Sequence, residues 1–334
     1  MTLKNNERQV KKMPNPQTSD IHINRALTEI SIRYNNENLI AKKALPIVPV
    51  AKDSDVYFIY GKQNLKSYDL ERAAGTRGKQ VEFKIVASSA YLCKEYANEL
   101  QVTDEDRDNA DDPIKMDADT TEYGTDINDQ DLEIKAASFY ASTSNYGDGT
   151  GSGATSMVDQ PGTKWSDTST GGDPVNDVET AKDKVRQMIG KKANTLIINE
   201  AVAIQLRKNP RILDFYKYTS AGMVSDEELA EFFRVQNLFV GSAIKDTTEE
   251  SATDTPETTP TSSDVWSSYA SAIYLPPNPG LKMVSFAYNF QRKGYPLVKK
   301  WREEAINSDW IRVSNKYAIV SIDPFAGFLL TNVI

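Results

Sequence analysis

The chain has 334 residues, 39% of them apolar and 26% charged, with a formal net charge of −8. That length predicts two domains or one large elaborated domain, and the acidic total argues against a dedicated nucleic-acid binder, which needs clustered lysine and arginine. The single cysteine, Cys93, and the single histidine, His22, exclude an intramolecular disulfide, a cysteine zinc cluster and a paired-histidine metal motif.

The N-terminal region is polar and begins with several basic residues. It has no apolar core of the kind found in a signal peptide, and no stretch of the chain approaches the roughly 18 apolar residues of a membrane span. We expect a soluble, cytosolic protein without a membrane partner. Residues 1–38 are predicted to form a flexible arm with one short helix over 20–34, in which His22 is exposed.

Two predicted strands flank a long polar segment. Val56–Tyr60 is rich in aromatic and β-branched residues, and Val81–Val86 alternates apolar and polar residues. About twenty mostly polar residues lie between them, and loops of that length without a function are uncommon. The pattern predicts a long protruding hairpin.

Residues 112–142 have apolar side chains at helical spacing, which predicts a long helix with a kink or weak point at Gly124. The glycine- and serine-rich residues 147–153 then predict a flexible link.

The second half of the chain alternates helix and strand signals and is predicted to be α+β. Asp173-Pro174 opens a helix that ends at Gly190, and Ser225 with Glu228 has the spacing of a capping box. Thr195–Ile198 predicts a short buried strand. Residues 310–313 and 317–322 are expected to form a hairpin around Ser314-Asn315-Lys316.

Charge is concentrated in a few segments. Residues 104–133 contain thirteen acidic residues against Arg107 and Lys115, and residues 246–263 contain five acidic residues, seven threonines and no base. No window matches a calcium-binding loop. The acidic residues 104–133 form either a solvated face or a docking surface for a basic element of another subunit. Residues 246–263 are expected to be a mobile surface loop.

The predicted hairpin supplies candidate basic partners for that docking surface. The candidate inter-subunit residues are Lys62, Lys66, Arg72, Arg77 and Lys79 on the hairpin, and Asp104, Asp106, Asp111 and Asp112 in the acidic stretch. No catalytic, cofactor-binding or metal-binding residues are predicted.

Three stretches resemble a known family: 40–57, then 91–96 with 109–113, and then Trp165 through Pro210. The chain resembles tailed-bacteriophage major capsid proteins of the Hong Kong phage type, which have the Johnson fold. The resemblance implies an N-terminal arm (1–45), an extended β-hairpin loop (46–95), a peripheral domain with a long spine helix (96–170), an axial domain (171–295), and C-terminal strands that return to the peripheral domain (296–334).

The resemblance implies a non-enzymatic structural protein that assembles into hexamers and pentamers of an icosahedral shell around double-stranded DNA. The implied partners are other copies of the chain, a separate scaffolding protein, a portal protein, DNA held without sequence specificity, and in some shells a decoration protein. The protein would be located in the virion capsid after assembly in the host cytoplasm.

Other functions stay open at this point. An encapsulin-like bacterial compartment would share the fold but hold cargo enzymes, and the acidic, threonine-rich segment 246–263 also suits a virion decoration or surface-binding protein. A hydrolase that uses the acidic cluster is the weakest alternative, because the chain has one histidine and no nucleophile motif.

Overall fold

The computed structural model describes residues 39–60, 67–80, 85–110, 114–147, 156–167, 172–216, 224–246, 262–280 and 283–334. The chain forms two compact units. The described part of the first unit comes from Tyr96–Asn128 and Pro296–Asn315, and the second unit comprises Glu37–Glu95, Asp129–Tyr295 and Lys316–Ile334. Each unit is described separately below.

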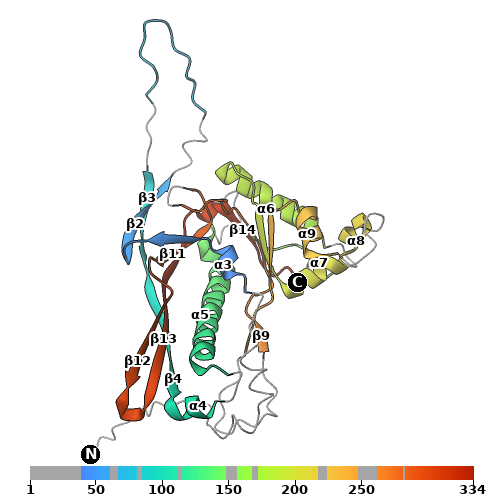
Figure 1. Cartoon of the computed structure of the whole chain (residues 1–334). Helices are drawn as coiled ribbons and strands as arrows, with labels where there is room; N and C mark the ends of the chain where they lie inside the picture. Colours follow the sequence, from blue (N-terminus) through green and yellow to red (C-terminus); the bar gives the residue numbers. More distant parts are fainter. Residues whose placement is uncertain are drawn as a thin grey trace, which may run out of the picture. The chain divides into compact units, whose positions relative to one another are not determined.

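Helices and strands are interspersed along the described chain (Figure 1). The helices are α3 (Ala41–Ala44), α4 (Asp104–Asn109), α5 (Met116–Ala141), α6 (Pro174–Ile189), α7 (Glu200–Lys208), α8 (Pro210–Tyr216) and α9 (Asp226–Phe232), with 3-10 turns η2 (Thr143–Asn145), η3 (Glu304–Ile306) and η4 (Pro324–Ala326). The strands are β1 (Ile47–Val50), β2 (Ser54–Tyr60), β3 (Ile85–Leu92), β4 (Lys94–Thr103), β5 (Val158–Asp159), β6 (Thr195–Asn199), β7 (Asn237–Gly241), β8 (Ile244–Asp246), β9 (Ser262–Asp264), β10 (Ala270–Ile273), β11 (Ala287–Arg292), β12 (Leu297–Glu303), β13 (Ser308–Ser321) and β14 (Gly327–Leu330).

The first unit contains strands β4, β13 and β12. Strands β12 and β13 are antiparallel, with Leu297 opposite Ser314 and Glu303 opposite Ser308, and β4 also pairs with β13. Val102, Ile311 and Val313 are buried together in a small apolar core. Burial of these side chains away from water is the main favourable contribution to packing in this unit.

The predicted hairpin around Ser314-Asn315-Lys316 is wrong. Strand β13 continues through these residues, and its hairpin partner is β12, which is connected through η3 and Asn307 at a φ of 46°. Ser314 is buried in the sheet, and its hydroxyl donates a hydrogen bond to the carbonyl of Leu297 at 3.1 Å. A polar residue that is satisfied inside a sheet has the same sequence signal as a turn.

The long helix predicted over 112–142 is confirmed as α5, which is continuous through Gly124. A Cβ atom added to Gly124 would lie 3.0 Å from Val313 and 3.1 Å from Leu100. The amide of Asn98 also donates to the Gly124 carbonyl at 2.7 Å. The glycine therefore permits close packing of helix on strands, which explains its presence in the middle of a helix.

The second unit contains a buried sheet in the strand order β5-β14-β10-β6-β7. Helix α6 packs against β14 and β10, α7 contacts β6 and β7, and α9 contacts β7 (Figure 1). Thr195–Ile198, predicted as a buried strand, lies within β6, and every residue of β6 is buried. In the same unit, β1 runs parallel to β11, and β11 pairs with the last residues of β13.

The predicted helix ends in this unit are confirmed. Asp173 accepts a hydrogen bond from the Asn176 amide at 3.2 Å, Pro174 occupies the first turn, and Gly190 ends α6 at a φ of 73°. Ser225 and Glu228 form the expected capping box at the start of α9. Such caps satisfy backbone groups that have no partner within the helix.

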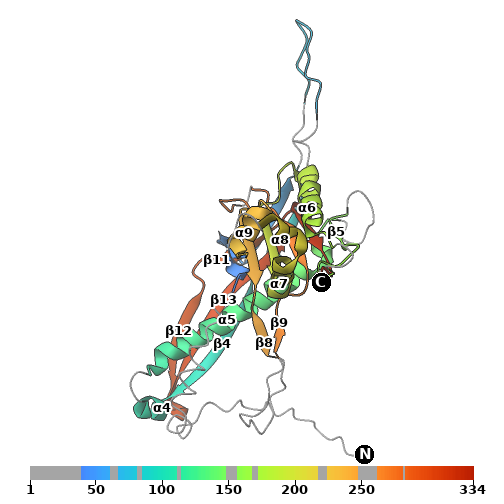
Figure 2. The same ribbon diagram turned by 90° about the vertical axis from the view of Figure 1, so that its right-hand side faces the viewer.

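Two strand ribbons also belong to the second unit. Strands β2 and β3 form a two-stranded antiparallel ribbon (Figure 1). Strands β8 and β9 form another (Figure 2). The first predicted strand of the long hairpin lies within β2. Of the second predicted strand, 81–86, residues 85 and 86 lie within β3, and residues 81–84 lie outside the described ranges.

Several predictions concern residues outside the described ranges. These are the helix over 20–34 with His22, Lys62, Lys66, Asp111 and Asp112, most of the 147–153 link, and residues 247–261 of the acidic loop. Cys93 is described, and it is buried as a small apolar residue, with its thiol 3.4 Å from the Phe290 carbonyl.

Candidate interaction surfaces

The described tip of the long loop, residues 67–80, is highly exposed. Residues 67–80 lie beyond the β2–β3 ribbon (Figure 1), and all of them except Tyr68 are exposed. A tight turn organises this tip: Gly75 has a φ of 82°, and the Thr76 amide donates to the Ala73 carbonyl at 3.2 Å. The Arg72 guanidinium donates to the Thr76 carbonyl at 2.8 Å. The tip is therefore ordered locally and covered by very little of its own unit.

The predicted basic residues of the tip are accessible where they are described. Arg72, Arg77 and Lys79 are exposed, and within the described residues none of them has an ion pair with an acidic side chain. Asp69 and Glu71 stand nearby in sequence, and Leu70 is 65% exposed. A surface with three cations and an exposed leucine is suited to contact with another protein.

The base of the loop is fixed by an aromatic cluster. Tyr57 on β2 and Tyr91 on β3 are buried, with ring centroids 5.9 Å and 4.7 Å from that of Phe290. The Tyr57 hydroxyl also donates to the Ser321 carbonyl at 3.2 Å. Burial of these large rings attaches the ribbon to β11 and β13.

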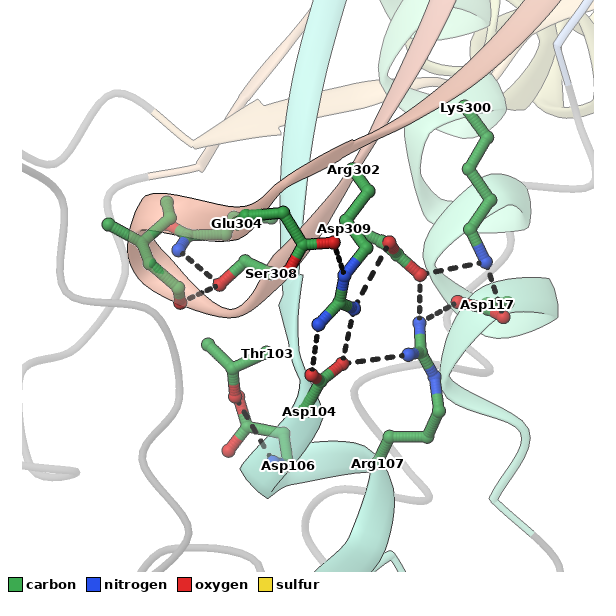
Figure 3. A network of polar contacts seen from close by, with 12 residues as sticks. Thr103, Asp104, Asp106, Arg107, Asp117, Lys300, Arg302, Glu304, Ser308 and Asp309 are labelled. Carbon is green, nitrogen blue, oxygen red and sulfur yellow. Dashed lines mark hydrogen bonds and ion pairs between the residues drawn. The ribbon is translucent and has the colours of Figure 1, made fainter.

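In the first unit, the candidate residues Asp104 and Asp106 have different roles. Asp104 forms ion pairs with Arg302 at 2.7 Å and with Arg107 at 3.2 Å (Figure 3). Asp106 is 9% exposed, and its carboxylate accepts a hydrogen bond from the Thr103 hydroxyl at 2.6 Å. Thr103 in turn accepts from the Asp106 amide and caps α4. Asp106 therefore supports a helix cap, whereas Asp104 belongs to a charged network.

That network extends across α4, α5 and the β12–β13 hairpin (Figure 3). The Asp309 carboxylate accepts from Arg107 at 2.8 Å and lies 3.1 Å from the Lys300 ammonium. Asp117 also pairs with Arg107 at 2.8 Å and with Lys300 at 2.9 Å. Each of these charges has at least two opposite partners, which is the arrangement in which surface ion pairs contribute most.

The network alters the acidity of its members. The hydrogen bond from Lys300 lowers the pKa of Asp309, and the hydrogen bond from Arg302 lowers the pKa of Asp104. The hydrogen bond to Asp117 raises the pKa of Lys300. All three shifts favour the charged forms.

Sequence reasoning did not identify the basic half of this network. Lys300 and Arg302 are close together in β12, but Asp104 lies 198 residues before Arg302. No spacing rule connects positions that far apart. The only local signal is the run of basic residues beside Trp301, which indicates an exposed strand.

Glu133 departs from the predicted solvated acidic face. Its side chain lies in the second unit and is completely buried. Its carboxylate accepts hydrogen bonds from the backbone amides of Ile40 at 3.1 Å and Ala41 at 2.7 Å, and from the Trp266 indole at 2.7 Å. Burial raises the pKa of Glu133.

Two further contacts from α5 hold the same segment. Asp129 accepts a hydrogen bond from the Lys42 ammonium at 2.7 Å, and the Tyr140 hydroxyl donates to the Ala44 carbonyl at 2.7 Å. Asp129, Glu133 and Tyr140 lie on one face of the helix at helical spacing. The described end of the predicted 1–45 arm is therefore attached to α5.

Two classes of site are not found in the described part of the chain. No group of three or more histidine, cysteine or acidic side chains there is arranged to hold a metal ion. Among the described helices, none combines the length and the apolar composition needed to cross a bilayer.

Comparisons with known proteins identify relatives among phage proteins. No protein-family model matches the chain. The major capsid protein of Burkholderia phage BcepMu is 23% identical over 312 residues, which cover 92% of this chain and 95% of that protein. The major capsid protein of Pseudomonas phage JBD67 is 27% identical over 261 residues, which cover 74% of this chain and 75% of that protein.

Solved structures share the fold. A phage-related protein of Bordetella bronchiseptica has a TM-score of 0.67 and 24% identity, covering 92% of this chain and 96% of that one. The capsid structure of cyanophage P-SCSP1u has a TM-score of 0.55 at 9% identity, covering 85% of each chain. The SrpI encapsulin of Synechococcus elongatus has a TM-score of 0.54 at 9% identity, covering 90% and 89%. The chain is therefore a homologue of phage major capsid proteins and has the α+β phage capsid fold that the sequence resemblance predicts.

Proposed function

We propose that the chain is the major structural subunit of a phage capsid and assembles with copies of itself into a closed shell. The observation that carries this proposal is the similarity to a phage major capsid protein over 92% of the chain. The role is structural and non-enzymatic. The exposed loop tip supports it, because a long ribbon covered so little by its own unit needs a neighbouring surface.

The finer organisation belongs to the same proposal. The subunits form hexamers and pentamers of an icosahedral shell that encloses double-stranded DNA. In this assignment residues 1–45 are the arm, 46–95 the extended loop, 96–170 the peripheral domain, 171–295 the axial domain and 296–334 the returning strands. Much of α5 lies within the proposed peripheral domain, as its spine helix.

The candidate inter-subunit residues remain part of the proposal. The exposed cations Arg72, Arg77 and Lys79 at the tip, together with Lys62 and Lys66, contact acidic residues of a neighbour. Asp104 still offers an accessible carboxylate, since its side chain is 36% exposed while it is paired with Arg302. Asp106 is the weaker candidate because it is buried under the α4 cap.

The chain also needs partners other than itself. We propose that these partners are a separate scaffolding protein, a portal protein, and DNA bound without sequence specificity. Assembly takes place in the host cytoplasm. Outside residues 104–133 and 246–263, which carry net charges of −11 and −5, the chain has a net charge of +8. A net positive charge on the rest of the chain is compatible with a shell surface that faces DNA.

An encapsulin-like compartment is less well supported. The similarity to the SrpI encapsulin is one of fold at 9% identity, whereas both relatives with similarity along most of the chain are phage major capsid proteins.

Mass photometry of the purified full chain tests the proposal. We expect discrete species at five and six times the 37.2 kDa subunit mass, together with much larger closed particles. A protein that stays monomeric at all concentrations, with or without its neighbouring genes, would contradict it. Nuclease-protected DNA inside the particles supports the capsid, and a co-purified cargo enzyme supports the compartment.

A further inference from the structure

The β2–β3 ribbon carries the exposed tip but is not part of a larger sheet. Among the described strands, β2 pairs only with β3 and β3 only with β2. An isolated two-stranded ribbon is marginal on its own, and of its two strands only β3 continues directly, through Cys93, into another strand, β4. The contacts at the base of β2 therefore contribute to the direction of the ribbon.

The apolar contacts at the base are strong but only weakly directional. Tyr57 and Tyr91 pack around Phe290 at tilted angles of 54° and 42°. The free energy of hydrophobic burial is roughly proportional to the apolar area removed from water and is not directional, so it changes little when the ribbon rotates by a small angle. Hydrogen bonds supply the directional contacts, and those between charged groups are stronger than the neutral one from the Tyr57 hydroxyl to the Ser321 carbonyl.

Asp53 supplies such a contact at the residue immediately before β2. One carboxylate oxygen accepts a hydrogen bond from the Arg292 guanidinium at 3.0 Å, and the other accepts from the Lys316 ammonium at 2.9 Å. Arg292 is the last residue of β11, and Lys316 lies in β13. The carboxylate is thus held from two different strands at once.

The backbone of Asp53 completes the arrangement. Its carbonyl accepts a hydrogen bond from the Cys93 amide at 2.8 Å, directly after β3 ends at Leu92. Both strands of the ribbon are therefore tied to the same residue. The hydrogen bond from Lys316 also lowers the pKa of Asp53, which keeps the carboxylate charged.

We infer that Asp53, held by Arg292 and Lys316, is a positioning residue that sets the direction in which the extended loop leaves the subunit. For its consequence in shell assembly this inference rests on the proposed function. The seven residues of β2 extend about 23 Å at 3.3 Å per residue, so a rotation of about 10° at the base moves their far end by roughly 4 Å.

Asp55 provides a matched control on the same ribbon. Its carboxylate pairs with Lys52 at 3.3 Å and accepts from the Val56 amide at 2.9 Å. Both partners are local, so Asp55→Asn removes an equal charge without removing a contact to β11 or β13. Arg292→Gln tests the same contact as Asp53→Asn from the other side.

The experiment measures the loop direction in the unassembled full chain. Nitroxide labels on cysteines introduced at Ala74 in the tip and Lys43 on α3, both exposed, report the distance between them by pulsed dipolar electron spin resonance. The native Cys93 is buried and stays unlabelled. Circular dichroism establishes that each variant is folded.

We expect a narrow distance distribution in the wild type and in Asp55→Asn. In Asp53→Asn and Arg292→Gln the distribution should broaden or shift by about 4 Å or more, as the ribbon geometry requires. If the Asp53→Asn distribution overlays that of the wild type, or if the wild type is already as broad, the inference is wrong. The distances are measured on single subunits, so this result is independent of whether the wild type builds shells.

Discussion

The Glu133 carboxylate accepts a hydrogen bond from the Ala41 backbone amide at 2.7 Å, across 92 residues of sequence. The same carboxylate accepts from the Trp266 indole, so one buried acid links α5, the segment before β1, and the residues before β10. No base among the described residues pairs with this buried carboxylate, and three donors replace the water it has lost.

Replacing Glu133 by Gln should lower the free energy of unfolding by about 2–3 kcal/mol, because an amide donor would then face backbone N–H donors. Asp129→Asn is the control one helical turn away. Its carboxylate bonds to the half-exposed Lys42, so the loss should stay below about 1 kcal/mol. Urea unfolding followed by tryptophan fluorescence checks both, and equal losses in the two variants would contradict the anchoring role of Glu133.

The pH dependence of the charged network in the first unit follows from its lowered pKa values. The pKa values of Asp104 and Asp309 are lowered from 3.8 in the folded protein. Their ionised carboxylates therefore contribute to folding stability above pH 3.8, and this contribution is lost as the pH falls through their pKa values in the folded state. The pKa of Glu133 is raised from 4.5, so its effect on stability has the opposite pH dependence. Its contribution to folding stability is present at low pH and is lost as the pH rises above 4.5.

Asp309→Asn should therefore lower the urea midpoint at neutral pH and flatten its decline below about pH 4. Glu105→Gln is the control, since Glu105 is an exposed acid on the same α4 and its carboxylate takes part in none of the network contacts. If the urea midpoints of the wild type and Asp309→Asn change with pH in parallel, the ion pairs of Asp309 do not stabilise the folded protein.

Charge reversal at the loop tip tests the assembly surface. Arg72→Glu with Arg77→Glu should impair capsomer and shell formation while the subunit remains folded, because both side chains are exposed and outside any core. Arg72→Lys with Arg77→Lys keeps the charge and should assemble. Sedimentation and circular dichroism separate assembly from folding, and normal particles from the charge-reversed variant would exclude the tip as an assembly contact.

Replacing residues 247–261 by a short Asn-Gly turn should leave folding and assembly unchanged. Asp246 and Ser262 face each other across the β8–β9 ladder, so a two-residue turn can close the ribbon. Particle yield and melting temperature check this prediction. Loss of particles would show that the acidic, threonine-rich segment takes part in assembly, and loss of surface binding alone would favour the decoration function for that segment.

Local sequence signals predicted the parts of the fold that depend on local physics. Periodicity predicted α5, and the cap residues Asp173, Gly190, Ser225 and Glu228 predicted the ends of α6 and α9. These features depend on contacts within a few residues, which is the range over which spacing rules operate.

The remaining features depend on long-range contacts. Ser314 appeared to be a turn residue because its partner, the Leu297 carbonyl, is 17 residues away in another strand. Asp104 is predicted only as an inter-subunit contact, because its partner Arg302 lies 198 residues later, beyond any spacing rule. Glu133 belongs by sequence to a stretch predicted to be a solvated face or a docking surface, whereas its hydrogen-bond donors are residues 40, 41 and 266 of the same chain.

Electron microscopy of the full chain, expressed alone and together with its neighbouring genes, tests shell assembly itself. We expect closed particles of uniform diameter, with image averages that resolve fivefold and sixfold capsomers. Dispersed single subunits under both conditions, or irregular aggregates without capsomers, would contradict it.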